Sequence, residues 1–292
     1  MELRRLPKEF SRTIVPRDAP ISMSQHDIEV SKLKRDLRFF PVSNPCPKKL
    51  TAAQIQSYNE HGYLSGFRVF GEAQAQEARE RSDRLLDRFI SEGKGSYAID
   101  RYQDRFRTIW DLATAPTILD YVEDLIGPNI VCWATHYFCK LPGDPKGVAW
   151  HQDCSYWPLT PSKTVTVWLA IDDVDRANGC MQVIPRSHLH GHLAFRESEP
   201  AEQNVLSQTI EGAERFGAPT DIELKAGEIS LHSDLLIHGS LPNLSSRRRC
   251  GLTLRYCPPD VRAYWDWNQA SILCRGMDVS GHWANAPRPM EG

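Results

Sequence analysis

The first half of the chain carries the hydrophobic spacing of helices. Three segments show it. The first opens with a capping box formed by Thr51 and Gln54 and ends at Gly62, a residue type that readily closes a helix. The other two are predicted over residues 72–93 and 116–127, where apolar residues recur on one helical face.

From residue 129 the pattern changes to that of β-strands. Short β-branched and aromatic runs are separated by Gly, Pro and Asp, with no helical segments between them. This favours a mainly β fold with flanking helices, built as a sandwich or barrel, over a parallel sheet. The runs are NIVCWATHYFCKLPG, TVTVWLAIDDV, CMQVIP, GEISLHSDLLIHGS and RCGLTLRYCP.

The chain is expected to form one domain over residues 50–292, with its β core at about 129–260. Residues 1–49 are rich in proline and charge and are predicted to be an irregular N-terminal arm. Such an arm could wrap the domain or pack on a second copy, so a homodimer is a possible state. The long polar segment 193–222 is expected to be a loop of the kind that often covers a site.

Composition and charge narrow the class of protein. A formal net charge of −2 gives no basic excess for a nucleic-acid partner, and no run approaches the roughly 18 apolar residues of a membrane span. The N-terminus lacks the apolar region of a signal peptide. The eight cysteines are scattered without a CxxC motif, which favours reduced thiols and a cytoplasmic location.

The stretch WHQDCSYW suggests a metal site. If it is a strand, His151 and Asp153 project to the same side and can fill two adjacent positions around a divalent metal. Two histidines and one carboxylate are typical of non-haem Fe(II) oxygenases. His238 is the preferred third ligand, at the end of an apolar strand. His232 and the histidines of SHLHGH (188–192) are alternatives, although the latter have no adjacent carboxylate.

The sequence resembles the phytanoyl-CoA dioxygenase family of Fe(II)- and 2-oxoglutarate-dependent oxygenases. The resemblance covers roughly residues 50–260, through EHGYL, WHQD, TVTVWLAIDDVDRANGCMQVIPRSH, KAGEISLHSDLLIHGS and RCGLTLRYCP, which occur in this order. It implies a double-stranded β-helix core, a jelly roll like that of the cupins. It also implies a small-molecule substrate and the use of Fe(II), 2-oxoglutarate and O2.

By position, the resemblance implies that His151, Asp153 and His238 are the iron ligands. It places Arg249 at the distal carboxylate of 2-oxoglutarate, for which a planar guanidinium is well suited. Trp168 and Thr166 on the TVTVW strand, together with His136, are expected at the same cosubstrate. Arg186 stands where the family often has glycine. The neighbouring Arg247 and Arg248 are interpreted as part of a solvated turn.

The residue type at position 153 also distinguishes a hydroxylase from a halogenase. Related halogenases have a small residue at the carboxylate position, where chloride binds the iron, so the aspartate here indicates a hydroxylase acting on an unactivated C–H bond. Two other classes stay open. One is a cupin-like Zn or Mn enzyme, an isomerase or hydrolase that does not use 2-oxoglutarate, and the other is a non-catalytic metabolite-binding protein of this fold.

The substrate is less well defined by the sequence. Aromatic walls and basic side chains could suit a small charged metabolite, and a cage around an alkylammonium group is one option. The candidate substrate-binding residues are Tyr137, Tyr156, Trp157, Arg255 and Arg107.

Overall fold

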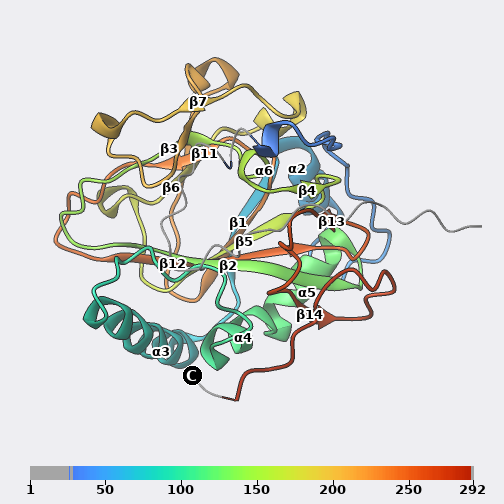
Figure 1. Ribbon diagram of the computed structural model, residues 1–292, viewed down its shortest axis with the longest axis horizontal. Helices are drawn as coiled ribbons and strands as arrows, with labels where there is room; N and C mark the ends of the chain where they lie inside the picture. The colour runs from blue at the N-terminus through green and yellow to red at the C-terminus, as the bar shows by residue number, and fades with distance from the viewer. Residues whose placement is uncertain (1–25, 27–28, 291–292) are drawn as a thin grey trace, which may run out of the picture.

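Two antiparallel β-sheets face each other across the interior of the protein (Figure 1). The computed structural model describes residues 26 and 29–290. In the order of hydrogen-bonded neighbours, the larger sheet contains β1 (Tyr63–Arg68), β10 (Glu228–Ser233), β5 (Val165–Ala170), β12 (Arg249–Cys257), β2 (Ile130–Lys140) and β14 (Ile272–Arg275). The smaller sheet contains β3 (Val148–His151), β11 (His238–Ser240), β6 (Met181–Val183) and β9 (Thr220–Ile222). The predicted mainly β fold with a jelly-roll core is confirmed.

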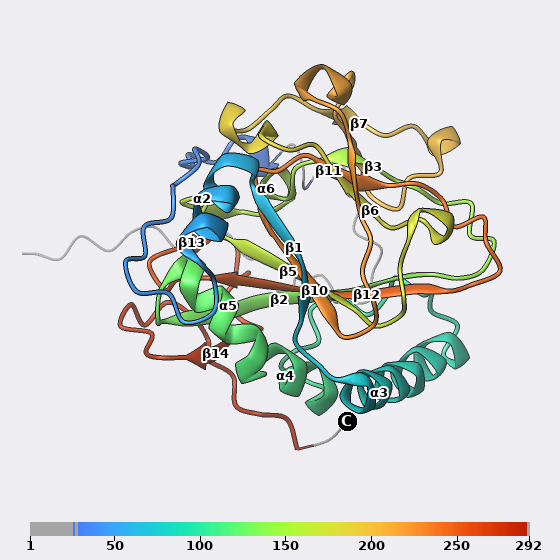
Figure 2. The same ribbon diagram turned by 180° about the vertical axis from the view of Figure 1, so that it is seen from behind.

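Helices α3, α4 and α5 cover the outer face of the larger sheet, and α2 and α6 lie on its other side (Figures 1 and 2). The three predicted helices are present as α2 (Ala52–His61), α3 (Glu72–Ser91) and α5 (Pro116–Ile126). Thr51 and Gln54 form the expected capping box, and Gly62 closes α2 with a φ of 84°. Two short helices, α4 (Arg107–Ala113) and α6 (Asp153–Tyr156), were not predicted, since neither has a side-chain cap that would mark its start.

The segment 225–240 forms two strands in different sheets. β10 pairs in the larger sheet, and β11 begins at His238 in the smaller one. Residues 235–237 between them are fully buried. An unbroken apolar run cannot reveal such a turn, because buried strand and buried turn have the same composition. His238 therefore starts a strand, whereas the sequence placed it at a strand end.

The strand content extends beyond the segments that the sequence marked. β1 and β14 lie outside residues 129–260 but belong to the larger sheet. The polar segment 193–222 contains a small hairpin of β7 (Arg196–Glu197) and β8 (Gln208–Thr209), and it ends in β9, which joins the smaller sheet. A further short pair is formed by β4 (Leu159–Thr160) and β13 (Arg262–Ala263).

The described part of the N-terminal arm packs on its own domain. Arg35 Nη1 donates to the carbonyl oxygens of Cys154 at 2.6 Å and Trp157 at 2.7 Å. Residues 1–25 and 27–28 of the predicted arm lie outside the described residues, so the homodimer stays a prediction. All eight cysteines are free thiols, and six of them are buried. No helix in the described ranges has the length and apolar character needed to cross a membrane.

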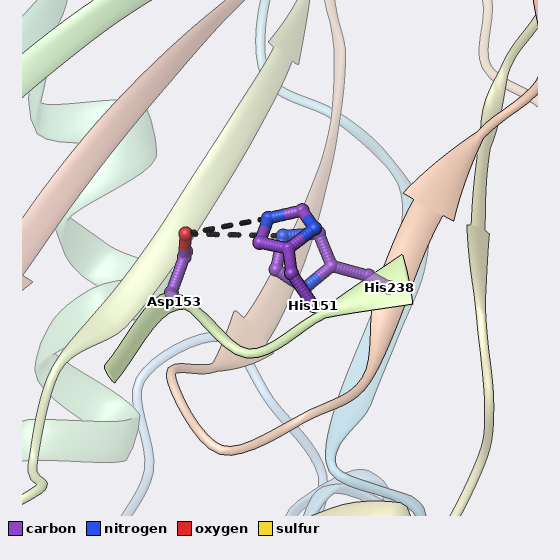
Figure 3. Close-up of side chains that lie close together, drawn as sticks. All are labelled: His151, Asp153 and His238. Atoms are coloured by element: carbon purple, nitrogen blue, oxygen red, sulfur yellow. Dashed lines mark ion pairs between the residues drawn. The ribbon is translucent and has the colours of Figure 1, made fainter. Parts of the chain in front are cut away.

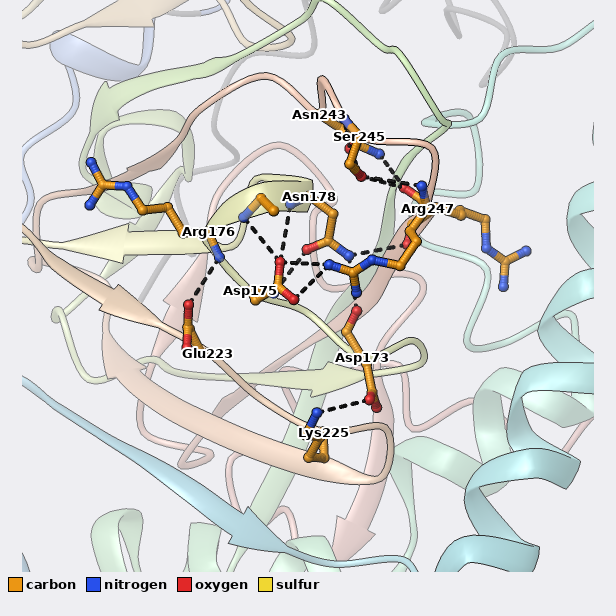
Figure 4. Close-up of polar contacts among 11 residues, drawn as sticks. Asp173, Asp175, Arg176, Asn178, Glu223, Lys225, Asn243, Ser245 and Arg247 are labelled. Carbon is orange, nitrogen blue, oxygen red and sulfur yellow. Dashed lines mark hydrogen bonds and ion pairs between the residues drawn. The ribbon is translucent and has the colours of Figure 1, made fainter.

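Polar contacts fix the turn that precedes β12 (Figure 4). Arg247 donates to both carboxylate oxygens of Asp175, at 2.8 and 2.6 Å, and Asn243 Nδ2 donates to the Arg247 carbonyl at 2.7 Å. Arg248 pairs with Asp172 and with Asp83 of α3. The interpretation as a solvated turn holds for Arg247, whose side chain is 48% exposed, but is wrong for Arg248, whose side chain is 17% exposed and paired with two carboxylates. These contacts hold the start of β12, where Arg249 lies.

Candidate metal centre

Two histidines of the candidate centre lie opposite each other on neighbouring strands. His151 ends β3, and its cross-strand partner in β11 is His238. Their ring centroids are 4.1 Å apart. His151 Nδ1 donates to the carbonyl of Ala149 at 2.8 Å, and His238 Nδ1 donates to the carbonyl of Leu236 at 3.0 Å. Because a carbonyl only accepts, each Nδ1 carries the proton, and each Nε2 keeps a lone pair for a metal.

Asp153 reaches the histidines from a helical turn. β3 stops at His151, Gln152 is the N-cap, and Asp153 is the first residue of α6. The expectation that strand alternation brings His151 and Asp153 together is therefore wrong. The chain bends after His151, and the bend directs the carboxylate toward both imidazoles.

The three side chains converge on one point (Figure 3). Asp153 Oδ1 lies 3.9 Å from Nε2 of His151 and 3.9 Å from Nε2 of His238. One ligand atom from each of the three residues lies within 4.8 Å of the others, and all three residues are buried. They are the one group with this geometry among the residues the structure describes.

Electrostatics keep the three groups in the protonation states that a metal requires. Burial lowers the pKa of both His151 and His238, so both imidazoles are neutral at neutral pH. Burial alone would raise the pKa of Asp153, but His238, His232 and Arg255 hold it below its usual value. The carboxylate is therefore ionised. Two neutral imidazoles and a carboxylate fit a divalent metal such as Fe(II).

The other oxygen of Asp153 faces the larger sheet. Thr166 Oγ1 donates to Asp153 Oδ2 at 3.2 Å, and His232 Nε2 lies 3.6 Å from the same oxygen. Thr166, predicted at the cosubstrate, thus lies behind the carboxylate. His232 is not a member of the metal-capable group. The SHLHGH histidines are dispersed: His188 bonds the Asn59 carbonyl, and His192 contacts Ser155.

Arg249 and Trp168 lie beside the metal-capable group in one cavity. The volume of this cavity is about 40 Å³. Arg249 is 2% exposed, its Nε donates to the Gly179 carbonyl at 2.8 Å, and its Nη2 donates to Ser240 Oγ at 3.0 Å. Its guanidinium carbon lies 5.5 Å from the centroid of the Trp168 ring. The cavity is lined by Phe138, Val148, His151, Asp153, Trp168, Met181, His232, His238, Gly239, Ser240, Arg249, Thr253 and Arg255.

Of the remaining predicted site residues, some lie at the cavity and the others do not line it. Arg255 lines the cavity, with Trp157 against it, and Tyr156 lies edge-on to His151, with centroids 5.8 Å apart. His136 shares the cavity face of β2 but does not line the cavity, and its Nε2 donates to the Tyr97 carbonyl at 2.7 Å.

Tyr137 and Arg107 contact no part of this cavity, contrary to the prediction that they bind substrate there. The Tyr137 hydroxyl shares a hydrogen bond of 2.9 Å with Ser82 of α3, on the opposite face of the sheet. Arg107 begins α4, on the outer layer, and bonds the carbonyl of Met290. Adjacent strand residues point to opposite faces, and the sequence does not say which face is the inner one.

The sequence-based prediction did not include Ser240, which lines the cavity, or Lys140, which lies beside it. Ser240 follows His238 by two positions in the same strand, so strand alternation could have indicated it. Lys140 is fully buried beside Arg249, its cross-strand neighbour in β2. Burial, and then the charge of Arg249, lower its pKa to about 6. No signal in the sequence distinguishes this lysine from a solvated one.

Comparisons with known proteins agree with this geometry. The family model described as phytanoyl-CoA dioxygenase (PhyH) matches residues 58–251. The chain is 27% identical to the peroxisomal phytanoyl-CoA dioxygenase of Bos taurus over 256 residues, which cover 80% of this chain and 72% of the relative. It is 30% identical over 163 residues to a probable alpha-ketoglutarate-dependent hypophosphite dioxygenase of Stutzerimonas stutzeri, covering 53% of this chain and 55% of that protein.

A solved structure shows the same likeness. The non-heme monooxygenase ThoJ, in its apo form, superposes with a TM-score of 0.66 and 27% identity, covering 81% of this chain and 88% of that one. Family model, relatives and fold all indicate the cofactors Fe(II), 2-oxoglutarate and O2. The chain belongs to the phytanoyl-CoA dioxygenase family of Fe(II)- and 2-oxoglutarate-dependent oxygenases.

Proposed function

We propose that this protein hydroxylates an unactivated C–H bond of a small metabolite. The observation that carries the proposal is the convergence of Asp153 with His151 and His238 in a buried group. The carboxylate occupies the position that a halogenase leaves to chloride, which favours oxygenation over halogenation. When bound, Fe(II) and 2-oxoglutarate supply the oxidising chemistry, with dioxygen as oxidant and succinate and carbon dioxide as by-products.

The residues of the chain hold and orient the reactants. We assign His151, Asp153 and His238 to the metal, through Nε2 of each imidazole and Oδ1 of the carboxylate. Two histidine ligands and one carboxylate would leave coordination positions free for 2-oxoglutarate and dioxygen. Thr166 holds the second oxygen of Asp153, which keeps the first oxygen directed at the metal.

We assign Arg249 to the distal carboxylate of 2-oxoglutarate. Its guanidinium is buried, and its hydrogen-bond partners in the described part of the chain are carbonyls and a hydroxyl. A buried cation without a carboxylate partner is costly, so the site favours an anionic ligand. Trp168 covers one face of the guanidinium, and Ser240 orients its Nη2.

The cavity supports a small substrate. Its volume of about 40 Å³ lies well below the roughly 300 to 1,000 Å³ of small-ligand sites, so it leaves no room for a large substrate unless side chains move. Aromatic and apolar lining residues exclude bulk water from the reacting atoms. A cytoplasmic location, which the eight free thiols support, also belongs to this proposal; cell fractionation tests it.

Anaerobic titration tests the proposal. Addition of 2-oxoglutarate to the Fe(II)-loaded protein should produce the visible charge-transfer band of the chelate, and admission of air should release succinate. A Zn or Mn enzyme that does not use 2-oxoglutarate gives no such band, and neither does a metabolite-binding protein. Asp153→Ala should abolish hydroxylation, whereas Asp87→Ala, an exposed carboxylate on α3, should change neither the band nor succinate release. Absence of the band in the wild-type protein would refute the proposal.

A further inference from the structure

Arg255 is a buried cation in the cavity that holds the candidate metal ligands. Its residue exposure is 8%, and its Nε has no hydrogen-bond partner among the described residues. Its ion pair in that part of the chain is with Asp100 Oδ1, at 3.9 Å. This carboxylate is 37% exposed and is shared with Arg101 at 3.3 Å and His136 at 3.8 Å. Asp100 therefore neutralises only part of the charge of Arg255.

Two tryptophans hold the Arg255 guanidinium in place. Its central carbon lies 5.0 Å from the ring centroid of Trp157 and 5.9 Å from that of Trp133. The two rings meet edge to face, with centroids 4.7 Å apart, and both are buried. Cation–π contacts orient the guanidinium but do not use its N–H donors, so the donors stay available to a ligand.

This arrangement argues against an alkylammonium cage. The aromatic faces of Trp133 and Trp157 already receive a cation of the protein itself. A second cation placed there would be repelled by Arg255 in a region of low dielectric constant.

The formal charges of the loaded cavity point to an anionic substrate. Arg249, Arg255 and a divalent metal bring four positive charges, and Asp153 with the two carboxylates of 2-oxoglutarate brings three negative ones. One positive charge is left over, and the partly exposed Asp100, which is shared with Arg101 and His136, offsets only part of it. Arg255 is six residues from Arg249 in β12, or about 20 Å along a strand, so one carboxylate cannot bind both side chains.

We propose that Arg255 binds an oxyanion of the substrate, and that the substrate is a small metabolite carrying a carboxylate or a phosphorus oxyanion. The proposal rests on the hydroxylase function proposed above. Arg255 acts as a specificity-determining residue: it anchors the anionic end of the substrate, while the C–H bond to be oxidised lies nearer the metal.

Ligand binding can be tested on protein loaded anaerobically with Fe(II) and 2-oxoglutarate. Butyrate and methylphosphonate are the anionic probes, butyramide is the neutral isostere of butyrate, and butylamine is the cationic probe. Binding is followed by intrinsic fluorescence, since Trp133 and Trp157 flank the guanidinium. We expect a saturable change with at least one anionic probe and none with butyramide or butylamine. Arg255→Gln should weaken anion binding at least tenfold, and Arg255→Lys, which keeps the charge, should weaken it less.

Controls separate this proposal from the proposed function. Arg84→Gln, an exposed arginine on α3, should bind the probes as the wild type does. The charge-transfer band of each sample reports whether the protein is folded and takes up 2-oxoglutarate, so its absence in the wild type counts against the oxygenase function alone. Anion binding that is equal in wild type and Arg255→Gln overturns the proposal. It is also overturned if the anions displace 2-oxoglutarate and Arg255→Gln lowers 2-oxoglutarate affinity tenfold, because Arg255 then serves the cosubstrate.

Discussion

At the scale of single residues, hydrogen bonds fix the protonation and orientation of the buried polar side chains of the site. The backbone carbonyls of Ala149 and Leu236 fix the tautomers of the two histidines. Arg249 is matched to carbonyls and a hydroxyl. Arg186, which replaces the glycine frequent in the family, adopts a φ of 71° and pairs with Glu60 at 2.9 Å. A left-handed conformation is strained in a non-glycine residue, and this exposed ion pair offsets little of that strain.

Substitution of Arg249 should act mainly on cosubstrate binding. Arg249→Lys keeps the charge but loses the planar fork, and Arg249→Ala loses both. We expect the 2-oxoglutarate concentration at half-saturation of the charge-transfer band to rise about tenfold for Lys and about a hundredfold or more for Ala, a loss of about 3 kcal/mol. Fe(II) affinity without 2-oxoglutarate should stay within about twofold. An unchanged 2-oxoglutarate requirement in Arg249→Ala would rule out its assignment as the clamp.

Asp234 should make the protein less stable as the pH rises. Burial, and then the charge of Asp153, raise the pKa of Asp234 to about 7, and Ser162 Oγ donates to its carboxylate at 2.6 Å. Between the unfolded pKa, near 4, and the folded pKa, the folded state binds more protons, so stability falls as the pH rises through this window.

Asp234→Asn removes this ionisation. The difference in unfolding free energy between the variant and the wild type should therefore shift by about 2 kcal/mol in favour of the variant between pH 5 and pH 8. Urea denaturation at the two pH values measures the difference. An equal effect of the substitution at both values would show that Asp234 does not titrate in this range.

At the scale of elements, β12 carries much of the cavity. Arg249, Thr253 and Arg255 line it from this strand, and Gly251 lies on the same face. A Cβ at Gly251 would lie 2.0 Å from the ring of Trp168. The glycine thus leaves the space in which Trp168 packs beside Arg249.

Gly251→Ala should therefore displace Trp168. We expect a loss of about 1–3 kcal/mol in unfolding free energy, typical of overpacking, together with weaker 2-oxoglutarate binding. Thermal unfolding and the charge-transfer titration measure the two effects. Gly95→Ala is the matched control, because a Cβ at Gly95 meets no atom within 4 Å. If the two variants lose the same stability and the same 2-oxoglutarate affinity, the space left by Gly251 does not determine the position of Trp168.

At the scale of the whole molecule, the N-terminal arm stabilises the segment that carries the carboxylate ligand. Arg35 reaches across to the carbonyls of Cys154 and Trp157, at the two sides of the turn after Asp153. His26 contacts the carbonyl of Tyr156 at 3.0 Å in the same segment. Segments far apart in the sequence thus determine where Asp153 lies.

Removal of the Arg35 contacts should loosen α6. For Arg35→Ala we expect a loss of about 1–3 kcal/mol in unfolding stability, since the hydrogen bonds come from a charged donor. We also expect weaker Fe(II) retention, by about tenfold, measured by dialysis against a chelator. Arg38→Ala, whose side chain is 72% exposed, should have little effect on either quantity. Unchanged Fe(II) retention in Arg35→Ala would show that the arm does not support the ligand segment.

The sequence by itself determined the features that depend on short-range pattern. Capping residues and apolar spacing placed α2, α3 and α5, and alternating or apolar runs predicted the strands of the core. The ordered motifs pointed to His151, Asp153 and His238 as a group. The helices and strands follow from contacts between residues close in the chain, and the ligand group follows from the order of the family motifs along it.

Only the tertiary structure decided which face of each strand is the inner one. Strand alternation groups His136 with Phe138 and separates them from Tyr137, but it does not say which group faces the cavity. The bend that brings Asp153 to the histidines, and the placing of β10 and β11 in different sheets, likewise depend on cross-strand pairing and on packing of the arm. Such contacts join residues that are distant in sequence, and their energy appears only when the sheets and the arm come together.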